Sequence, residues 1–295
     1  MHGLIFRGNL DSQENRKGVY YICKSTIRTR NNMSRPKRWQ VLEEKDGVWT
    51  IQLASWKYFH DYITQEMLNY SHYVWRGDRL DDRPLLLSFD RDHPSLTKAQ
   101  IEERLKAHLD QFKLATRGRR GLNPSRLDTD NDWWALGQHH GLKTPLLDWT
   151  RSPFVALFFA FEKLKKPQTP NRAIYAVNPG SCTKFTKTIR AAHKGKLRPD
   201  IVEFFTPLQD ENFRLVNQSG LFSRCTAGKT LDEWIQERYP GYGSGVLIKI
   251  LIPNRYRLDC LRTLNKMNIN SLTLFPDLYG ASGFANMVES IGNYY

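Results

Sequence analysis

The chain has 295 residues, of which 40% are hydrophobic and 12% aromatic, so it can bury a sizeable core and is not intrinsically disordered. Its 44 Lys and Arg exceed its 30 Asp and Glu and give a net charge of +14. This charge favours a polyanionic partner such as nucleic acid. The alternative is that the charge serves only solubility. Its apolar runs fall far short of the roughly 20 residues of a transmembrane helix, and its start lacks a signal-peptide pattern, so we expect a cytoplasmic protein without a membrane partner.

The first 45 residues differ in composition from those that follow. Two apolar clusters between Leu4 and Cys23 flank a polar, turn-rich stretch and predict a pair of strands. The segment from Lys24 to Lys45 is basic and poor in aliphatic residues, which predicts a connector. We therefore divide the chain into a basic strand pair with its connector, residues 1–48, and a main domain, residues 49–295. The candidate nucleic-acid contacts in the connector are Arg28, Arg30, Lys37 and Arg38.

The main domain is expected to open with a helix and a short strand. Apolar residues at helical spacing predict a helix from Trp56 to Leu68, and the apolar run from Tyr73 to Trp75 predicts a buried strand. Arg76 then stands at the end of that strand. Thr97 and Gln100 have the spacing of a capping box and predict the start of a second helix, on the surface.

A helix, a strand and another helix follow. The first helix is predicted from Asp132 to Gly141, and the strand from Pro145 to Trp149. Ser152 and Pro153 are a good N-cap and a good first residue for the next helix. That helix is almost wholly apolar as far as Phe161, so it must be buried on most sides.

The rest of the chain mixes both kinds of element. Strands are predicted at Ala173 to Val177, Phe213 to Val216, Val246 to Ile252 and Leu272 to Phe275, and a helix at Leu258 to Met267. Strands and helices that do not alternate regularly favour an α+β domain.

Charged or hydroxyl side chains occur at three places where the surrounding pattern predicts burial, namely Arg76, the segment from Asp148 to Ser152, and Asp277. A buried charge is costly unless it is paired. Arg76 and Asp148 therefore either pair with each other as structural groups or bind a ligand. The four cysteines and eight histidines show no metal-binding spacing, so we expect no metal site.

These places resemble the FRG domain, a family named for its aromatic-Arg-Gly motif. The matching segments, in the family's order, are Trp75-Arg76-Gly77, Gln138 to Leu142, Thr144 to Pro153, Ala156 to Ala160, Asn212 to Phe222 and Leu274 to Gly280. The letters of Phe6-Arg7-Gly8 also fit, but no amphipathic helix precedes them, so we do not take them as the motif. Two departures are Pro145, where the family usually has an arginine, and Tyr279, where it commonly has an acidic residue.

The order of the same residues in turn resembles ADP-ribosyltransferases of the Arg-Ser-Glu type. This second resemblance implies a mixed or antiparallel sheet core with flanking helices, and NAD as the cofactor. The implied cofactor contacts are Arg76 on the pyrophosphate, Gly77 on the nicotinamide carboxamide, Thr150 and Ser152 on the ribose, and Phe158 or Phe159 on the nicotinamide ring.

The resemblance also implies catalytic roles. Asp277 would stabilise the developing positive charge, with Glu289 as the reserve choice. Either His139 or His140 would act as a general base towards the acceptor. The structural alternative is that one of these histidines caps its helix and the other packs on Trp149.

Taken together, these implications lead to the hypothesis of an NAD-dependent mono-ADP-ribosyltransferase toxin that modifies nucleic acid, with RNA preferred to DNA. The family's setting suggests a toxin–antitoxin or antiviral defence system, and so an antitoxin protein as a further partner. Two alternatives stay open: a transferase that modifies protein, and a non-catalytic nucleic-acid-binding defence module, which would bind without turning NAD over. A metal-dependent nuclease does not fit, because the acidic residues do not cluster as metal ligands do.

Overall fold

The computed structural model describes residues 37–163, 169–207 and 213–294, which belong to a single unit that begins at Lys37. The strand pair predicted between Leu4 and Cys23 lies outside the described residues. The end of the expected connector, Trp39–Lys45, forms the first strand, β1. It pairs with the next strand through the turn at Asp46 and Gly47.

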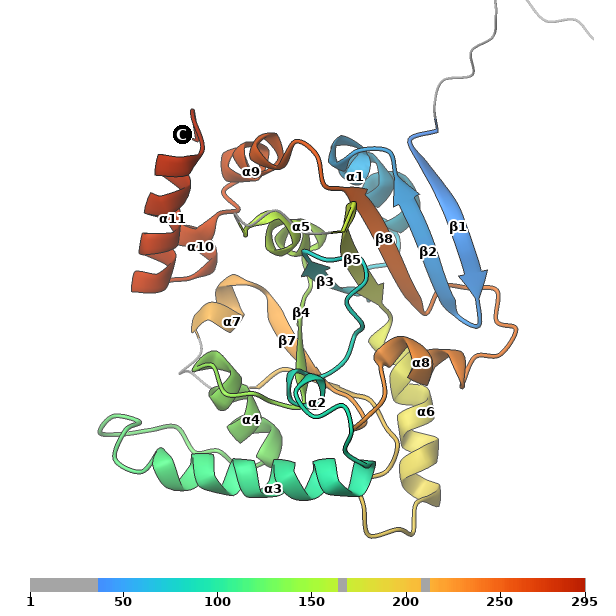
Figure 1. Ribbon diagram of the computed structural model, residues 1–295, viewed down its shortest axis with the longest axis vertical. Helices are drawn as coiled ribbons and strands as arrows, with labels where there is room; N and C mark the ends of the chain where they lie inside the picture. Colours follow the sequence, from blue (N-terminus) through green and yellow to red (C-terminus); the bar gives the residue numbers. More distant parts are fainter. Residues whose placement is uncertain (1–36, 164–168, 208–212, 295) are drawn as a thin grey trace, which may run out of the picture. The chain divides into compact units, whose positions relative to one another are not determined.

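In the described residues, eight strands form one sheet with the order β1-β2-β8-β5-β3-β4-β7-β6 (Figure 1). The strands are β1 (Trp39–Lys45), β2 (Val48–Leu53), β3 (Val74–Asp78), β4 (Leu146–Thr150), β5 (Asn171–Val177), β6 (Glu203–Phe205), β7 (Gly220–Arg224) and β8 (Leu247–Pro253). Strands β2 and β8 run parallel, and every other neighbouring pair is antiparallel. The predicted α+β class is confirmed by this mixed, mostly antiparallel sheet.

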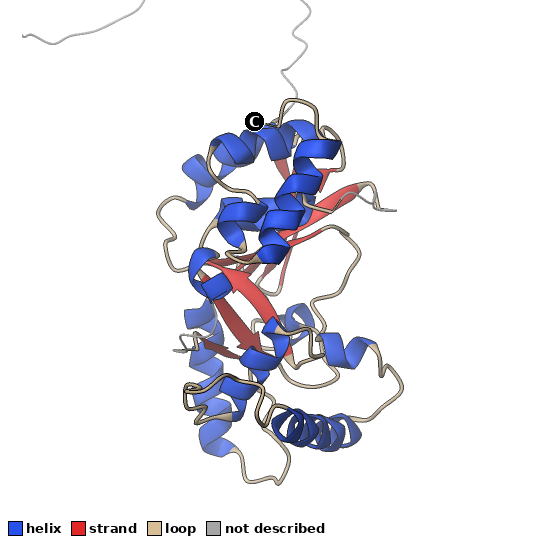
Figure 2. Cartoon of the chain, turned by 90° about the vertical axis from the view of Figure 1, so that its left-hand side faces the viewer, coloured by secondary structure: helices blue, strands red, loops and turns tan. Residues whose placement is uncertain are grey.

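Helices lie on both sides of the sheet (Figure 2). The α-helices are α1 (Phe59–Tyr62), α2 (Ser88–Arg91), α3 (Lys98–Ala115), α4 (Asp130–His139), α5 (Pro153–Phe161), α6 (Pro179–Ala192), α7 (Phe213–Asn217), α8 (Leu231–Gln236), α9 (Arg257–Lys266), α10 (Ser271–Leu274) and α11 (Leu278–Ser290). A 3-10 turn, Trp56–Tyr58, and a π-helical turn, Ile63–Met67, flank α1 and complete the predicted helix from Trp56 to Leu68. No helix in the described residues is long and apolar enough to span a membrane.

Alternation along the central strand β5 divides the core between the two faces of the sheet. Ile174 and Ala176 face a cluster with α1, α5, α9 and α11, whereas Ala173, Tyr175 and Val177 face a cluster with α6 and α8. A third cluster joins α2, α3 and α4 to the strands β4 and β7. The sheet is therefore covered on both faces over β5, as its unbroken apolar sequence requires.

The apolar helix α5 packs directly on β3. Ser152 caps its first turn by accepting a hydrogen bond from the backbone N of Val155, as predicted. At its other end, Arg172 donates to the carbonyl of Ala160, and Arg257 donates to the carbonyls of Phe161 and Glu162. These two guanidinium groups satisfy backbone acceptors that the end of a helix leaves open.

Strands β3 and β4 meet at a single pair, Trp75 with Thr150, and then separate. Beyond that point β3 pairs with β5 alone, and β4 pairs with β7 alone. The sheet is thus split between its two halves, and the split leaves the side chains that follow Trp75 without a neighbouring strand on one side. Arg76 lies within β3, which corrects its predicted position at the end of the strand.

Two predicted strands are wrong. Residues 213–216 lie in α7, and residues 272–274 lie in α10. Both are short apolar runs, for which a strand and a buried helical turn have the same pattern. Asn270 decides the second case, because its side chain accepts from the backbone N of Thr273 and so starts a helix.

Candidate functional site

A cavity of about 640 Å³ opens where β3 and β4 separate. Its walls come from β3, the end of α4, β4, the end of α5, α7 and the first residues of β7, together with Phe275. This volume lies in the range of about 300 to 1,000 Å³ that is usual for small-molecule sites. Of the three places that the sequence singled out, the cavity brings together Arg76 and the first part of the segment from Asp148 to Ser152, whereas Asp277 lies outside its lining.

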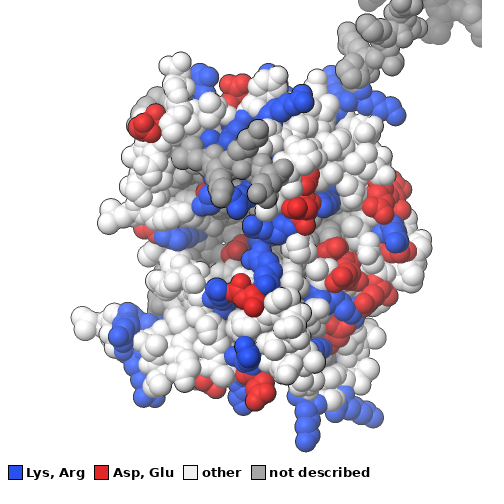
Figure 3. All heavy atoms as spheres, viewed as in Figure 1, with Lys and Arg blue, Asp and Glu red and all other residues white. Residues whose placement is uncertain are grey.

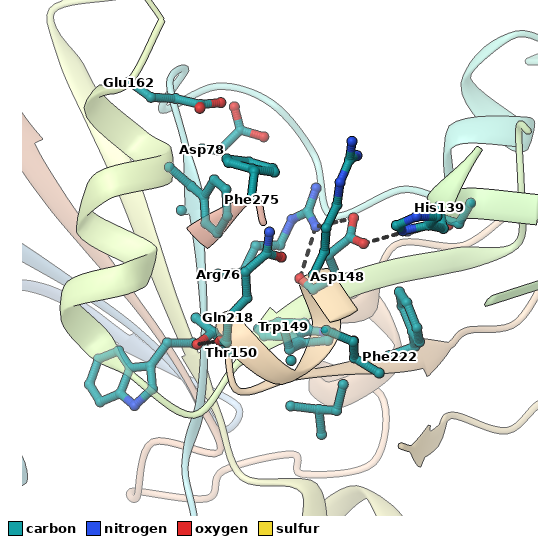
Figure 4. Close-up of a pocket in the computed structure, with 18 of the residues that line it drawn as sticks. Arg76, Asp78, His139, Asp148, Trp149, Thr150, Glu162, Gln218, Phe222 and Phe275 are labelled. Carbon is teal, nitrogen blue, oxygen red and sulfur yellow. Dashed lines mark hydrogen bonds and ion pairs between the residues drawn. The ribbon is translucent and has the colours of Figure 1, made fainter. Parts of the chain in front are cut away.

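Arg76 is the central cation of the cavity (Figure 4). Its Nη1 donates to the backbone oxygen of Asp148 at 3.0 Å and lies 3.7 Å from Oδ2 of the same residue. Its side chain is only 17% exposed, and its Nε is buried without a hydrogen-bond partner in the described residues. The pairing of Arg76 with Asp148 is thus real but incomplete, and a buried unsatisfied donor of this kind calls for an acceptor.

Asp148 is held from a second side by Gln138. The Nε2 of Gln138 donates to Oδ1 of Asp148 at 2.7 Å, and its Oε1 accepts from the hydroxyl of Thr144. His139 follows in the last turn of α4 and lines the cavity, and Asp148 lies between Arg76 and His139 in Figure 4. The ring of His139 meets that of His140 edge-on, with the centroids 4.8 Å apart. One histidine of the pair therefore reaches the site.

The hydroxyl groups expected on the nicotinamide ribose are used inside the protein. Thr150 lines the cavity, but its Oγ1 donates to the backbone oxygen of Gln218 at 2.6 Å and accepts from the backbone N of Ser152 at 3.0 Å. Ser152 caps α5 and does not line the cavity. Both residues fix the junction between β4 and α5, which in turn positions the cavity wall.

Gly77 is required by packing. A Cβ atom at this position would lie 1.9 Å from the carbonyl oxygen of Ala156 in α5. Of the two phenylalanines considered for stacking, Phe158 is fully buried in the core, and Phe159 lines the cavity. The ring of Phe159 lies 6.0 Å from that of Phe275, so these two residues form an aromatic wall.

Asp277 does not stand at the end of a strand and does not line the cavity, which corrects the expected geometry. It is the N-cap of α11, where its Oδ1 accepts from the backbone N of Gly280 at 3.2 Å. Its Oδ2 accepts from Nε of Arg214 at 2.7 Å. Partial desolvation acts to raise the pKa of Asp277, but the bonds from Arg214 and Gly280 outweigh it and hold the pKa below its usual value.

Arg214 itself lines the cavity and was missed by sequence reasoning. Its guanidinium lies 5.5 Å from the ring centroid of Phe275 and 5.2 Å from that of Tyr279. Tyr279 is the position at which the sequence departs from the family's common acidic residue, and here it supplies a cation–π contact in place of a charge. The signal that was available is the arginine in the segment from Asn212 to Phe222.

Three acidic residues line the cavity: Asp78, Asp148 and Glu162. Of these, the sequence singled out only Asp148. Asp78 is nearly buried, pairs with Arg83 at 3.4 Å, and accepts from the backbone N of Leu80. Glu162 follows α5, and burial raises the pKa of its carboxyl even though Nζ of Lys163 lies 3.3 Å away. A charged residue directly after the apolar run of α5 was the sequence signal for Glu162.

The lining is basic on balance, because five cations face three carboxylates and one histidine. The cations are Arg76, Arg79, Arg83, Lys163 and Arg214. Figure 3 shows Lys and Arg side chains beside a hollow near the middle of the face it presents. Such a cavity attracts anionic ligands.

The remaining expected residues lie elsewhere. Lys37 is exposed, and Arg38 pairs with Asp61 at 2.9 Å next to the start of β1; neither lines the cavity. Arg28 and Arg30 lie outside the described residues. The reserve carboxylate, Glu289, is exposed on α11 and away from the cavity lining.

Residues 71–169 match the family model of the FRG domain, which confirms the resemblance over this segment. The matched segment extends from just before β3 to just beyond α5 and supplies Arg76, His139, Asp148 and Glu162 to the cavity. No curated protein and no solved structure matches the chain significantly.

Proposed function

We propose that the cavity binds NAD and that the protein is a mono-ADP-ribosyltransferase that modifies nucleic acid in the cytoplasm, as the toxin of a toxin–antitoxin or antiviral system. The observation that carries this proposal is Arg76, whose side chain is 17% exposed and whose buried Nε has no hydrogen-bond partner among the described residues, in a basic cavity of dinucleotide size. A planar guanidinium suits a pyrophosphate, since it donates in two parallel directions.

The arrangement of the strands also supports this proposal. Arg76 and Thr150 lie on adjacent antiparallel strands, the sheet splits beside them, and an apolar helix follows the second strand. The order of an arginine on a first strand, a Ser/Thr motif on a second strand and then an apolar helix is the one that the resemblance to ADP-ribosyltransferases implies. The aromatic wall of Phe159 and Phe275 offers a surface for a flat heterocycle such as nicotinamide.

Bound NAD would supply an ADP-ribosyl group joined to nicotinamide as the leaving group. The protein would have to balance the positive charge that develops at the sugar and accept a proton from the acceptor. Asp148 is committed to Arg76 and Gln138, and Asp78 to Arg83. Glu162 is the carboxylate in the lining whose raised pKa suits it to take up a proton. We therefore assign the acceptance of the proton to Glu162, together with His139.

Asp277 has a positioning role in this scheme. It holds the guanidinium of Arg214 against Phe275 at the cavity wall. Asp277 therefore acts on the cavity by fixing the position of the positive charge of Arg214. Arg214 would then balance the second phosphate of the pyrophosphate that Arg76 contacts.

The test is to incubate the purified protein and NAD with one acceptor at a time: RNA, single-stranded DNA or a protein extract. Mass spectrometry then detects ADP-ribose added to each acceptor. We expect transfer to nucleic acid and none from Arg76→Gln. Transfer to protein alone would favour the protein-modifying alternative. NAD or nucleic-acid binding without transfer to any acceptor would contradict the enzyme and favour a non-catalytic defence module.

A further inference from the structure

A second cavity, of about 580 Å³, lies at the opposite end of α4 from the candidate site. Trp133, in the first turns of α4, lines this second cavity, whereas His139, in the last turn, lines the first. His139 follows Trp133 by six positions, a rise of about 9 Å along a helix. We call the second site the Trp133 cavity.

Lys113, Arg117 and Arg120 line the Trp133 cavity, and we call the whole segment from Lys113 to Arg126, which also carries Arg119 and Arg126 beside the lining residues, its rim. The segment from Lys113 to Arg126 contains five basic residues and no Asp or Glu. Lys113 pairs with Asp130 at 2.7 Å, and Arg126 pairs with Asp128 at 2.6 Å. Arg117 and Arg119 are exposed, and neither forms an ion pair in the part of the chain that the structure describes. The lining also holds one carboxylate, Asp110.

An aromatic ring stands among these charges. Trp133 is half-buried, and the guanidinium of Arg120 and the ammonium of Lys113 lie 5.3 Å and 5.9 Å from its ring centroid. The neighbouring Trp134 is 1% exposed and belongs to the core. A partly open tryptophan within a basic rim is the combination by which proteins hold single strands, since bases stack on rings and phosphates contact arginines.

We propose that the Trp133 cavity binds single-stranded nucleic acid, with a base against Trp133 and Arg120 and with phosphates on Arg117, Arg119 and Arg126. From there, α4 would lead the strand to His139 and the candidate site. That distance is within the footprint of about 4 to 16 nucleotides that such surfaces cover. The delivery of an acceptor to the first cavity rests on the proposed function, whereas the binding itself does not.

The experiment measures binding of a fluorescently labelled RNA of about 12 nucleotides by anisotropy, over a series of salt concentrations and without NAD. The test variant removes three charges from the rim: Arg117→Gln, Arg119→Gln and Arg126→Gln together. The matched control removes three exposed charges from α6 and the loop after it: Lys187→Gln, Lys194→Gln and Lys196→Gln. All six positions are exposed, so both variants should fold.

The rim variant is expected to bind at least tenfold more weakly than the control variant. The slope of log affinity against log salt should become shallower by about 0.7 for each phosphate that the variant no longer neutralises. Trp133→Leu should weaken binding about tenfold, and Trp133→Phe should restore most of it, because a ring remains for stacking. A single-stranded DNA should follow the same pattern, and a duplex of the same length should bind more weakly.

Equal losses of affinity in the rim and control variants would overturn the proposal, as would parent-like binding by a folded Trp133→Leu protein. Binding that prefers the duplex would also overturn it. The same titration with Arg76→Gln separates this inference from the proposed function. If Arg76→Gln binds RNA as tightly as the parent but the parent transfers no ADP-ribose, the assignment of nucleic-acid binding to the Trp133 cavity holds and the proposed transferase activity is wrong.

Discussion

The carboxylate of Asp277 accepts a hydrogen bond from Nε of Arg214 at 2.7 Å and thereby joins the start of α11 to α7 at the wall of the cavity. Two further bonds hold the end of α7 and the residue after it to α10, from Asn217 to the backbone oxygen of Thr273 and from Gln218 to that of Leu274. The position of Arg214 in the cavity therefore depends on Asp277, an ion-pair partner that lies some 60 positions later in the chain.

The Asp277–Arg214 pair predicts how stability depends on pH. Because the folded protein lowers the pKa of Asp277, the pair contributes stability above the ordinary carboxyl pKa of 3.8 and loses that contribution as pH falls through the lowered value. Asp277→Asn keeps an acceptor for the helix cap but removes the charge. Its melting temperature should be below the parent's at pH 7, and the difference should shrink at pH 3.

Asp82→Asn is the control for this comparison, because Asp82 is exposed and has no ion-pair partner among the described residues. It should follow the parent at both pH values. In the transfer assay, Asp277→Asn and Arg214→Gln should behave alike. A fall of roughly 100-fold in Asp277→Asn with none in Arg214→Gln would return the catalytic role to Asp277.

Gly77→Ala is predicted to destabilise the protein. The added methyl group would meet the carbonyl oxygen of Ala156 at 1.9 Å and the backbone N of Ala160 at 2.7 Å, so α5 would have to move away from β3. We expect a loss of about 3 kcal/mol or more in the free energy of unfolding, measured by urea denaturation. Gly243→Ala meets nothing within 4 Å and should change stability little. Equal stability of the two variants would contradict the close packing of α5 on β3.

Glu162→Gln is predicted to stabilise the protein at neutral pH. Burial raises the pKa of Glu162 in the folded state, so folding favours the protonated carboxyl. The stability that this provides is complete below the ordinary pKa of 4.5 and is lost as pH rises through the raised value. A neutral glutamine should therefore unfold at a higher urea concentration than the parent at pH 8, and at a similar one at pH 4. A variant less stable than the parent at pH 8 would show that the pair with Lys163 outweighs burial.

Most of the fold could be predicted from local patterns. Capping residues such as Thr97 and Ser152 mark real helix starts, and the apolar runs around Trp75, Trp149 and Ile250 are strands as expected. The errors fall on α7 and α10, which are each about one turn long. A short apolar run has no period, and its conformation was decided by a cap and by packing between distant segments.

The site could be predicted as a set of segments but not as a set of contacts. The resemblance correctly brought Arg76, His139 and Asp148 to one cavity. The cap that Ser152 forms on α5 follows from the local sequence. The resemblance could not show that Thr150 donates to the backbone oxygen of Gln218, because that bond joins residues 68 positions apart in the chain. Nor could it identify Arg83, Glu162 or Arg214, whose roles depend on where the sheet splits.

The most direct test of the central claim is calorimetric titration of NAD into the parent protein, into Arg76→Gln and into Arg255→Gln, whose side chain is exposed and away from the cavity lining. We predict measurable binding to the parent and to Arg255→Gln, and binding at least tenfold weaker to Arg76→Gln, because a charge-assisted hydrogen bond contributes about 1.5 to 3 kcal/mol. An absence of binding to the folded parent, or equal affinity of the parent and Arg76→Gln, would contradict the assignment of this cavity to NAD.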